Sequence, residues 1–377
     1  MSTKKTIAVG MSGGIDSSTA VYLLKKQGYD VIGLTMKIWD GPQTHATKRG
    51  GCYGPNEAHD IADAEKAARI LGVPHYIVDL REEYQETVIE YFRKEYGQGR
   101  TPNPCVVCNA RIKFGSLLEK AFSSGIEFDF FATGHYARVA YEPAYRINLL
   151  KRGMDAQKDQ SYFLSRLKQE QLERLHFPLG EYEKREVRQI ALESGLQEFL
   201  QKPESQDFLE YDNYTMLLKD EGVPGNIRDV HGNVIGVHRG IPSYTIGQRR
   251  FLGLPGLKEP FYVLHISHAK NEIVAGPEKY LFRKDLLAEN MNWFVPFSHP
   301  LWQGPVHAQV RYRSAPAECT VEPNNAGGAL VRFTQGQKAV TPGQAVVFYA
   351  HDTVLASGTV NLSRDELHPP DENNPSS

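Results

Sequence analysis

The chain has 377 residues, and its 43 Lys and Arg against 45 Asp and Glu give a formal net charge of −2 at pH 7. Hydrophobic residues make up 41% and charged residues 23%, a globular composition that excludes a largely disordered chain. At about 150 residues per domain we expect two or three domains. Because the whole chain is nearly neutral, a nucleic-acid partner would need a local basic surface.

The cellular location is expected to be the cytoplasm. The four cysteines are too few for a disulfide framework. The apolar runs are too short to cross a bilayer, and residues 1–5 lead into a strand-like run with no signal-peptide core. We therefore expect no membrane partner.

Strand-like runs and helical patterns alternate over the first 200 or so residues. Strands are expected at residues 6–9, 30–36, 75–78 and 128–133. Helices are expected after Ser18 up to Gly28 and at residues 57–71, 82–96 and 109–122. This alternation predicts a parallel sheet with helices on both faces. Ligands of such sheets bind beyond the carboxyl ends of the strands, where the loop after residue 9, Met36, Gly134 and the region of Cys105 fall.

A glycine-rich loop follows the first expected strand and reads Gly10-Met11-Ser12-Gly13-Gly14-Ile15-Asp16-Ser17. Glycines let the backbone approach a phosphate, and the helix behind them offers free amides and a partial positive charge. The loop contains no Lys, which excludes the Walker type of phosphate loop. A plain glycine turn without a ligand is the alternative interpretation.

The pattern Ser-Gly-Gly-x-Asp-Ser resembles the pyrophosphate loop of the PP-loop ATP pyrophosphatases, which adenylate a carbonyl oxygen. That resemblance implies ATP as substrate and Asp16 as the residue that orients Mg²⁺ or pyrophosphate. More motifs follow in the chain: Thr101-Pro102-Asn103-Pro104-Cys105, Cys108-Asn109, Ala132-Thr133-Gly134-His135-Tyr136, Lys158-Asp159-Gln160-Ser161, Gly247-Gln248-Arg249-Arg250 and Val310-Arg311-Tyr312. In this order they resemble the bacterial tRNA-specific 2-thiouridylases (the MnmA/TrmU family), over about residues 5–360.

The resemblance implies a sulfurtransferase that adenylates the C2 oxygen of the tRNA wobble uridine and replaces it with sulfur. The implied partners are tRNA and a protein that donates or relays sulfur. ATP would be held by Gly10, Met11, Ser12, Gly13, Gly14, Ile15, Asp16 and Ser17, with Met36 and Gly134 beside the adenosine. The flipped target base would meet Asn103, Pro104 and Cys105. The tRNA would be contacted by His135, Lys158, Asp159, Gln160, Arg311, Tyr312 and Gln344.

The cysteines depart from the family pattern of two catalytic thiols. Cys108 matches the first of them, but Cys105 occupies a position where the family has Asp. The second family cysteine would end the stretch Glu204-Ser205-Gln206-Asp207-Phe208-Leu209, where this chain has leucine. Because leucine cannot carry sulfur, the usual two-cysteine relay needs another explanation.

Three explanations stay open. Cys105 and Cys108 can form a persulfide and disulfide pair, since Cys-x-x-Cys spacing supports redox chemistry and is expected to lower a thiol pKa. Alternatively, Cys52, Cys105 and Cys108 can hold a [4Fe–4S] cluster with one open iron, and thiolate ligands suit such a cluster. The third explanation is that sulfur transfer has been lost. A zinc site lacks an obvious fourth ligand, and Cys319 is expected to be a buried structural thiol.

The expected fold class is α/β with a PP-loop (adenine nucleotide alpha hydrolase-like) domain over residues 1–208. A small central α/β module is expected over residues 209–284, with a hairpin at 226–236 and strands at 261–266 and 272–275. Regularly spaced strands predict a C-terminal β-barrel over residues 285–365, and residues 366–377 are expected to be a disordered tail. Two other functions stay open: thiolation of another RNA uridine, such as one in ribosomal RNA, and a non-catalytic RNA-binding protein.

Overall fold

The computed structural model describes residues 4–41, 46–47, 50–202, 207–219, 222–254 and 259–362. The expectations for the tail and for residues 204–206 lie outside these ranges. The chain divides into two compact units. The first comprises Met1–Val88, Pro104–Asn213 and Asp352–Val354, and the second comprises Ile89–Asn103, Tyr214–His351 and Leu355–Ser377. No helix in the described ranges has the length and apolar character needed to cross a bilayer.

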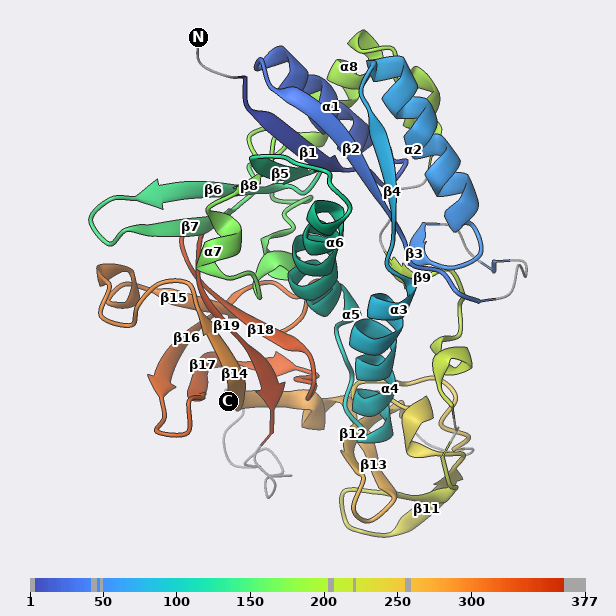
Figure 1. The fold of residues 1–377 in the computed structure, drawn as a ribbon. Coiled ribbons are helices and arrows are strands. Elements are labelled where there is room, and N and C mark those ends of the chain that lie inside the picture. Colours follow the sequence, from blue (N-terminus) through green and yellow to red (C-terminus); the bar gives the residue numbers. More distant parts are fainter. Residues whose placement is uncertain are drawn as a thin grey trace. The chain divides into compact units, whose positions relative to one another are not determined.

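A five-stranded parallel sheet organises the first unit, in the order β4-β2-β1-β5-β8 (Figure 1). Its strands are β1 (Thr6–Gly10), β2 (Asp30–Lys37), β4 (His75–Asp79), β5 (Phe130–Thr133) and β8 (Leu175–His176). Gly10 at the end of β1 is opposite Leu34 of β2 and Thr133 of β5. The carboxyl ends of these strands therefore meet at one edge, and the predicted parallel sheet is confirmed.

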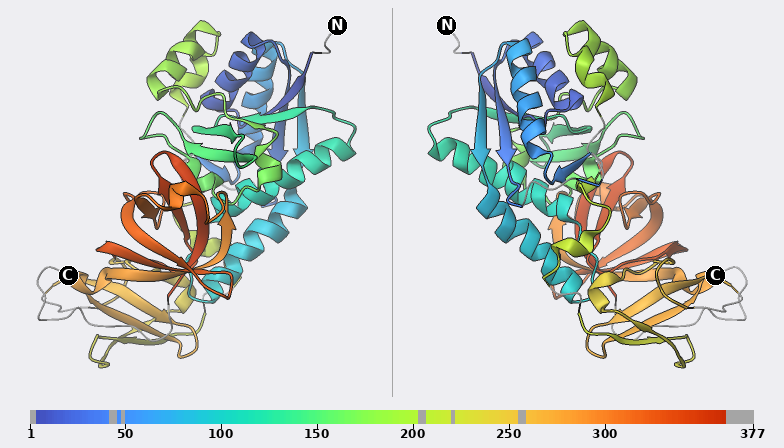
Figure 2. Two further views of the ribbon diagram at one scale, coloured as in Figure 1. Left: turned by 90° about the vertical axis from the view of Figure 1, so that its left-hand side faces the viewer. Right: turned by 90° about the vertical axis from the view of Figure 1, so that its right-hand side faces the viewer.

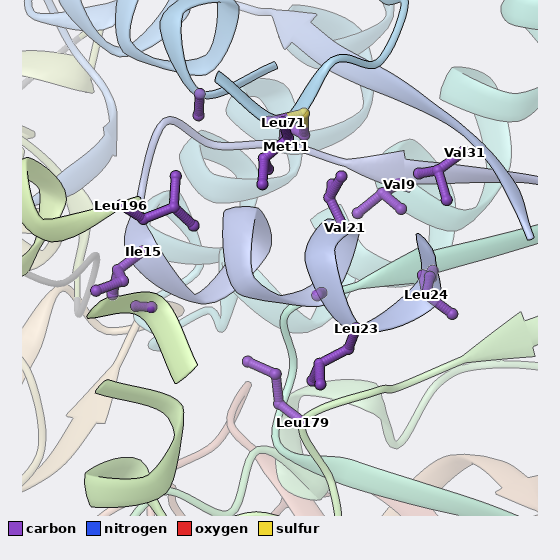
Figure 3. Close-up of a cluster of buried hydrophobic side chains, with 14 of the residues drawn as sticks. Val9, Met11, Ile15, Val21, Leu23, Leu24, Val31, Leu71, Leu179 and Leu196 are labelled. Atoms are coloured by element: carbon purple, nitrogen blue, oxygen red, sulfur yellow. The ribbon is translucent and has the colours of Figure 1, made fainter. Parts of the chain in front are cut away.

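Helices cover both faces of this sheet (Figure 2). One face packs against α1 (Ile15–Lys26), α2 (Glu57–Leu71) and α8 (Lys184–Glu193). The shared core includes Val9, Val21, Leu24, Val31 and Leu71, all buried (Figure 3). Side chains alternate along β5, so Ala132 joins this core while Phe131 lies against Phe114 with ring centroids 5.7 Å apart. This alternation gives each face its own apolar layer.

Two expected long helices are each composed of several shorter pieces. The first runs through α3 (Arg81–Tyr84), the π-helical η1 (Gln85–Ile89) and α4 (Glu90–Gly97). The second runs through α5 (Pro104–Val107), the π-helical η2 (Cys108–Ser116) and α6 (Leu117–Ser123). Insertions of π-helix are rare and often accompany functional positions. Cys108 lies at the first position of such a segment.

The first unit also contains two strand pairs that the sequence pattern did not predict. An antiparallel hairpin joins β6 (Ala137–Glu142) to β7 (Ile147–Arg152). The short strand β3 (Gly51–Tyr53) pairs in parallel with β9 (Asp207–Leu209). The remaining elements of this unit are η3 (Ser161–Leu164), α7 (Gln169–Leu172) and η4 (Gln197–Gln201).

The second unit contains a four-stranded sheet and a closed barrel. The sheet has the order β11-β10-β13-β12 and consists of β10 (Gly225–Arg228), β11 (Val234–His238), β12 (Phe261–Ser267) and β13 (Glu272–Pro277). The barrel order is β14-β17-β16-β15-β18-β19, and a β14–β19 pairing closes it. Its strands are β14 (Phe282–Trp293), β15 (Val306–Gln309), β16 (Ala317–Pro323), β17 (Ala329–Lys338), β18 (Ala345–Ala350) and β19 (Thr353–Asn361). Short 3₁₀ turns are η5 (Tyr214–Leu217), η6 (Ile241–Ser243), η7 (Glu278–Leu281) and η8 (Pro300–Trp302). The predicted C-terminal barrel is confirmed.

Candidate functional site

The loop between β1 and α1 has the geometry of an anion site. Gly13 has φ +69°, and a Cβ there would lie 2.3 Å from the carbonyl oxygen of Asp60. The backbone N–H of Ser12 donates to Ser17 Oγ at 3.2 Å, and Ser17 Oγ donates to the carbonyl of Gly14 at 3.1 Å. Gly14 is the N-cap of α1 and supplies no side-chain hydrogen bond to the helix. The first amides of α1 therefore face the loop without a capping side chain, as an anion would require.

Asp16 lies in the first turn of α1 and contacts two residues from distant parts of the chain. It accepts a hydrogen bond from the Tyr136 hydroxyl at 3.0 Å. Lys184 Nζ lies 2.7 Å from its Oδ1 and 2.8 Å from its Oδ2. Gly134 lies directly beside this turn, because a Cβ on Gly134 would be 2.7 Å from the backbone nitrogen of Ser17. The end of β5 and the glycine-rich loop are therefore one site.

A second lysine, Lys202, also contacts the loop. It directly follows η4 in the chain. Lys202 Nζ donates to the carbonyl of Gly13 at 3.2 Å and pairs with Asp60 and Asp63 at 2.7 and 2.8 Å. Burial opposes the charge of Lys202, but the hydrogen bonds and charges of Asp60 and Asp63 outweigh it and raise the lysine pKa. The loop itself lacks Lys, and the sequence pattern gave no signal that Lys184 and Lys202 contact it.

The two methionines assigned to ATP have different surroundings. Met11 is 3% exposed, and its carbonyl accepts a hydrogen bond from Thr35 Oγ1 at 2.8 Å. Its sulfur lies against Gly33, where a Cβ would approach within 2.6 Å. Met36 is half-buried near the end of β2. Contact of Met36 with adenosine stays a prediction.

Cys105 and Cys108 lie three residues apart on the consecutive helical segments α5 and η2. That spacing places the two side chains on one face. Cys105 is half-buried and Cys108 is buried. Burial raises the pKa of the Cys108 thiol to about 12, although the positive charge of Lys113 acts in the opposite direction. The expectation that the Cys-x-x-Cys spacing lowers the thiol pKa is therefore wrong for Cys108, because desolvation of the thiolate outweighs the nearby charge.

Cys52 lies on β3, next to the strand that carries Leu209. Tyr53 is the register partner of Leu209, and Cys52 Sγ donates to the carbonyl of Phe208 at 3.5 Å. Cys52 retains solvent-exposed surface, yet desolvation of its thiolate by the surrounding protein outweighs the positive charge of Lys113 and raises the pKa of the thiol. Leu209, expected from the resemblance to match the family's second thiol, is a buried leucine with a cysteine on the neighbouring strand.

The hydroxyl of Tyr84 interacts electrostatically with all three cysteines of the first unit. This hydroxyl is buried, and a hydrogen bond between it and the Cys52 thiol acts to lower the pKa of that thiol. Burial raises its pKa well above the ordinary value, and the charges of Cys52, Cys108 and Cys105 raise it further. All three thiols therefore lie within electrostatic reach of one buried hydroxyl. Across the described ranges, however, no group of three or more His, Cys, Asp or Glu side chains is arranged to hold a metal ion.

The residues assigned to tRNA in the first unit have internal partners. His135 Nδ1 lies 2.7 Å from Thr133 Oγ1, and burial lowers the His135 pKa well below its ordinary value, which keeps the imidazole neutral. Asp159 accepts hydrogen bonds from Ser161 N, Ser161 Oγ and Gly153 N, and burial raises its pKa. Gln160 Oε1 accepts from the backbone of Tyr136 at 3.0 Å. Lys158 is half-buried and follows Asp155 in the same loop. These contacts shape the loop before η3, and contact with RNA stays a prediction.

The remaining tRNA and target-base residues belong to the second unit, except Pro104 and Cys105, which begin α5. Gln344 Nε2 donates to the carbonyls of Thr101 and Pro102, both at 3.0 Å, and so holds the segment that leads to Asn103. Arg311 is exposed after β15, and Tyr312 accepts a hydrogen bond from Gln309 through its carbonyl. Gln344 therefore has a defined positioning role within its own unit.

Comparisons with known proteins cover all three expected regions. Residues 5–209 match the model of the tRNA methyl transferase HUP domain, residues 215–277 match the tRNA methyl transferase PRC-barrel domain, and residues 283–360 match the aminomethyltransferase beta-barrel domain. A protein of Thermoanaerobacter sp. strain X514 named tRNA-specific 2-thiouridylase MnmA 2 is 45% identical over 366 residues, 96% of this chain and 99% of its own.

Other relatives give the same result. The tRNA-specific 2-thiouridylase MnmA 1 of Caldanaerobacter subterraneus subsp. tengcongensis is 43% identical over 367 residues, 96% of this chain and 99% of its own length. The corresponding protein of Endomicrobium trichonymphae is 43% identical over 96% of this chain and its whole length. With the phosphate-type loop, the Asn-Pro-Cys segment and the three matching regions in one chain, this protein belongs to the tRNA-specific 2-thiouridylase MnmA family.

Proposed function

We propose that this protein is an ATP-dependent sulfurtransferase that converts the wobble uridine of tRNA to 2-thiouridine in the cytoplasm. The observation that carries the proposal is the combination, in one compact unit, of the Asp16 loop with the cysteines of α5 and η2. Relatives named tRNA-specific 2-thiouridylase, which match almost the whole chain, support the same reaction. The partners are tRNA and a protein that delivers sulfur.

The first step is adenylation of the uracil. The C2 oxygen attacks the α-phosphorus of ATP, the bond to the β-phosphate breaks, and pyrophosphate leaves. The amides at the start of α1 and the hydroxyls of Ser12 and Ser17 are suited to hold the phosphates. Asp16 offers carboxylate oxygens of the kind Mg²⁺ prefers, and a metal bound with the nucleotide would neutralise part of the phosphate charge. The product carries AMP on C2, where it is a good leaving group.

The second step replaces that AMP with sulfur. Cys105 is the more accessible thiol of the pair, so it takes the outer sulfur of a donor persulfide and leaves the donor as a thiol. The terminal sulfur of Cys105 attacks C2 and AMP departs with the former C2 oxygen. Cys108 then gives up its thiol proton and attacks Sγ of Cys105, which breaks the bond between that Sγ and the transferred sulfur and forms a Cys105–Cys108 disulfide. The departing 2-thiouridine takes up one proton. A dithiol reductant restores both thiols with two electrons and two protons.

A [4Fe–4S] cluster on Cys52, Cys105 and Cys108 is the alternative means of sulfur delivery. The three thiols share the surroundings of Tyr84, but the described residues do not form a metal-holding group. The cysteine pair is therefore the proposed sulfur carrier. Iron and sulfide analysis of protein purified without oxygen distinguishes the cysteine pair from the cluster. About four irons per chain, lost in Cys52→Ala, would show that a cluster delivers the sulfur. Iron-free protein that still thiolates tRNA would support the cysteine pair.

The function is tested by incubating the protein with ATP, a sulfur donor and a tRNA transcript, then measuring 2-thiouridine by nucleoside mass spectrometry. Cys108→Ala and Asp16→Ala should abolish the product. Cys319→Ala should retain it, because that buried cysteine lies on β16 of the other unit. Thiolation by Cys108→Ala at the wild-type rate would overturn the assignment.

Gene deletion separates the other two functions. Loss of 2-thiouridine from ribosomal RNA alone would support thiolation of ribosomal RNA. No loss of 2-thiouridine from any RNA would support a non-catalytic RNA-binding protein.

A further inference from the structure

Lys184 is the first residue of α8, and its ammonium group lies at the glycine-rich loop. Its Nζ is 2.7 and 2.8 Å from the two carboxylate oxygens of Asp16 and 5.8 Å from the centroid of the Tyr136 ring. The Lys184 side chain is 12% exposed and that of Asp16 is 28% exposed. A nearly buried cation therefore lies beside the first turn of α1, where the amides of the phosphate loop are directed.

Stability alone is a weak reason for placing this charged pair here. An ion pair in a poorly solvated place is often no more stabilising than an apolar pair of similar size, because both charges must be desolvated. Asp16 also interacts favourably with the positive end of α1 without any lysine. The lysine at this position therefore points to a task that requires a positive charge.

Lys202 provides a useful contrast within the same loop. It pairs with two carboxylates of α2, Asp60 and Asp63, and donates to the Gly13 carbonyl. Those contacts hold the backbone of the loop in place. Lys184 instead pairs with Asp16, a residue of the phosphate site itself. An ammonium carries three N–H donors, so it can serve a carboxylate and a phosphate oxygen together.

We propose that Lys184 is a phosphate-binding catalytic residue, which supplies from α8 the positive charge that the loop lacks. The inference rests on the proposed adenylation. When the C2 oxygen attacks the α-phosphorus, the bond to the β-phosphate breaks and negative charge moves onto the leaving pyrophosphate. Lys184 Nζ, held by Asp16, donates a hydrogen bond to that group and stabilises the charge as it develops. Asp16 acts here as the positioning residue of the lysine.

The test measures binding of inorganic pyrophosphate by calorimetric titration, with no RNA or sulfur donor present. Lys184→Met should weaken pyrophosphate binding about 10- to 100-fold, the range expected for one lost charge-assisted hydrogen bond. AMP binding should change less than threefold. Lys184→Arg keeps the charge and should recover most of the affinity. The matched control is Lys66→Met, which removes a lysine of α2 that is 50% exposed and pairs with Glu198.

Several outcomes separate this inference from its alternatives. Unchanged pyrophosphate affinity in a folded Lys184→Met protein would overturn it. Equal losses of pyrophosphate and AMP affinity with a lower melting temperature would also overturn it, because they indicate a structural role. The double variant Asp16→Asn, Lys184→Met should not regain pyrophosphate affinity. If the single variant instead lost affinity only because the unpaired Asp16 charge repels the anion, the double variant would regain it, and the inference would be overturned. Failure of the wild-type protein to bind ATP or pyrophosphate would instead count against the proposed function.

Discussion

At the scale of single residues, burial controls the chemistry of the thiols more than their spacing does. Cys108 is buried in the turn where α5 becomes η2, and its thiol pKa rises to about 12. The neutral thiol is therefore the form favoured by the fold. A raised thiol pKa contributes stability that is fully present below the unfolded value of about 8.5 and is lost as pH rises toward 12.

Alkylation of Cys108 should therefore have an unusual pH dependence. In the folded protein the rate of labelling by iodoacetamide should rise about tenfold per pH unit from pH 8 to 10.5 without a plateau, since the thiolate fraction keeps increasing. In the urea-unfolded chain the same residue should reach a plateau above about pH 9. Peptide mass spectrometry follows the modification. A plateau near pH 9 in the folded protein would contradict the raised pKa.

At the scale of elements, signals that lie within a few residues of the chain predicted the structure well. The helix of residues 57–71 agrees with α2, and Gly72 ends it in the left-handed conformation with φ +61°. The loop before α1 and the strands β1, β2 and β4 also follow from local patterns. The strands β3 and β9 were missed because they are short and each depends on a partner about 156 residues away. The local hairpin of β6 and β7 was missed as well.

The site shows the same division between local and distant contacts. Asp16 was identified from its loop, but its partners Tyr136 and Lys184 are 120 and 168 residues away. No motif marks Lys184, since the residues around it form an ordinary exposed helix start. Tyr84 was missed for a similar reason, because a buried tyrosine is normally part of a core. Long-range packing decides which ordinary residues become part of a site.

The loop geometry makes a sharp prediction for Gly13. Gly13→Ala places a Cβ 2.3 Å from the Asp60 carbonyl, whereas Gly28→Ala, at φ +94°, meets nothing within 4 Å. The backbone strain is shared and costs about 1–2 kcal/mol. Overpacking adds roughly 1–3 kcal/mol for Gly13 only. Thermal unfolding should show a larger loss for Gly13→Ala, together with loss of ATP binding. Equal melting temperatures and equal ATP affinity for the two variants would contradict the close approach.

At the scale of the whole molecule, a formal net charge of −2 implies that RNA binding depends on a few local cations. Arg311→Gln should weaken tRNA binding and reduce the slope of log Kd against log salt by about one, the value expected for one phosphate contact. Arg332→Gln is the matched control, since Arg332 is an exposed barrel arginine paired with Glu322. Filter binding at several salt concentrations measures both. An unchanged slope in Arg311→Gln would remove Arg311 from the RNA contacts.

The central claim is that ATP activates the C2 oxygen of the wobble uridine before sulfur replaces it. The most direct measurement uses a synthetic anticodon stem-loop whose wobble uridine carries ¹⁸O at C2. After reaction with unlabelled ATP and a sulfur donor, mass spectrometry of the released AMP reports where that oxygen goes. The adenylation account predicts one ¹⁸O in AMP for each 2-thiouridine formed. Unlabelled AMP, with ¹⁸O lost to water while 2-thiouridine accumulates, would contradict it.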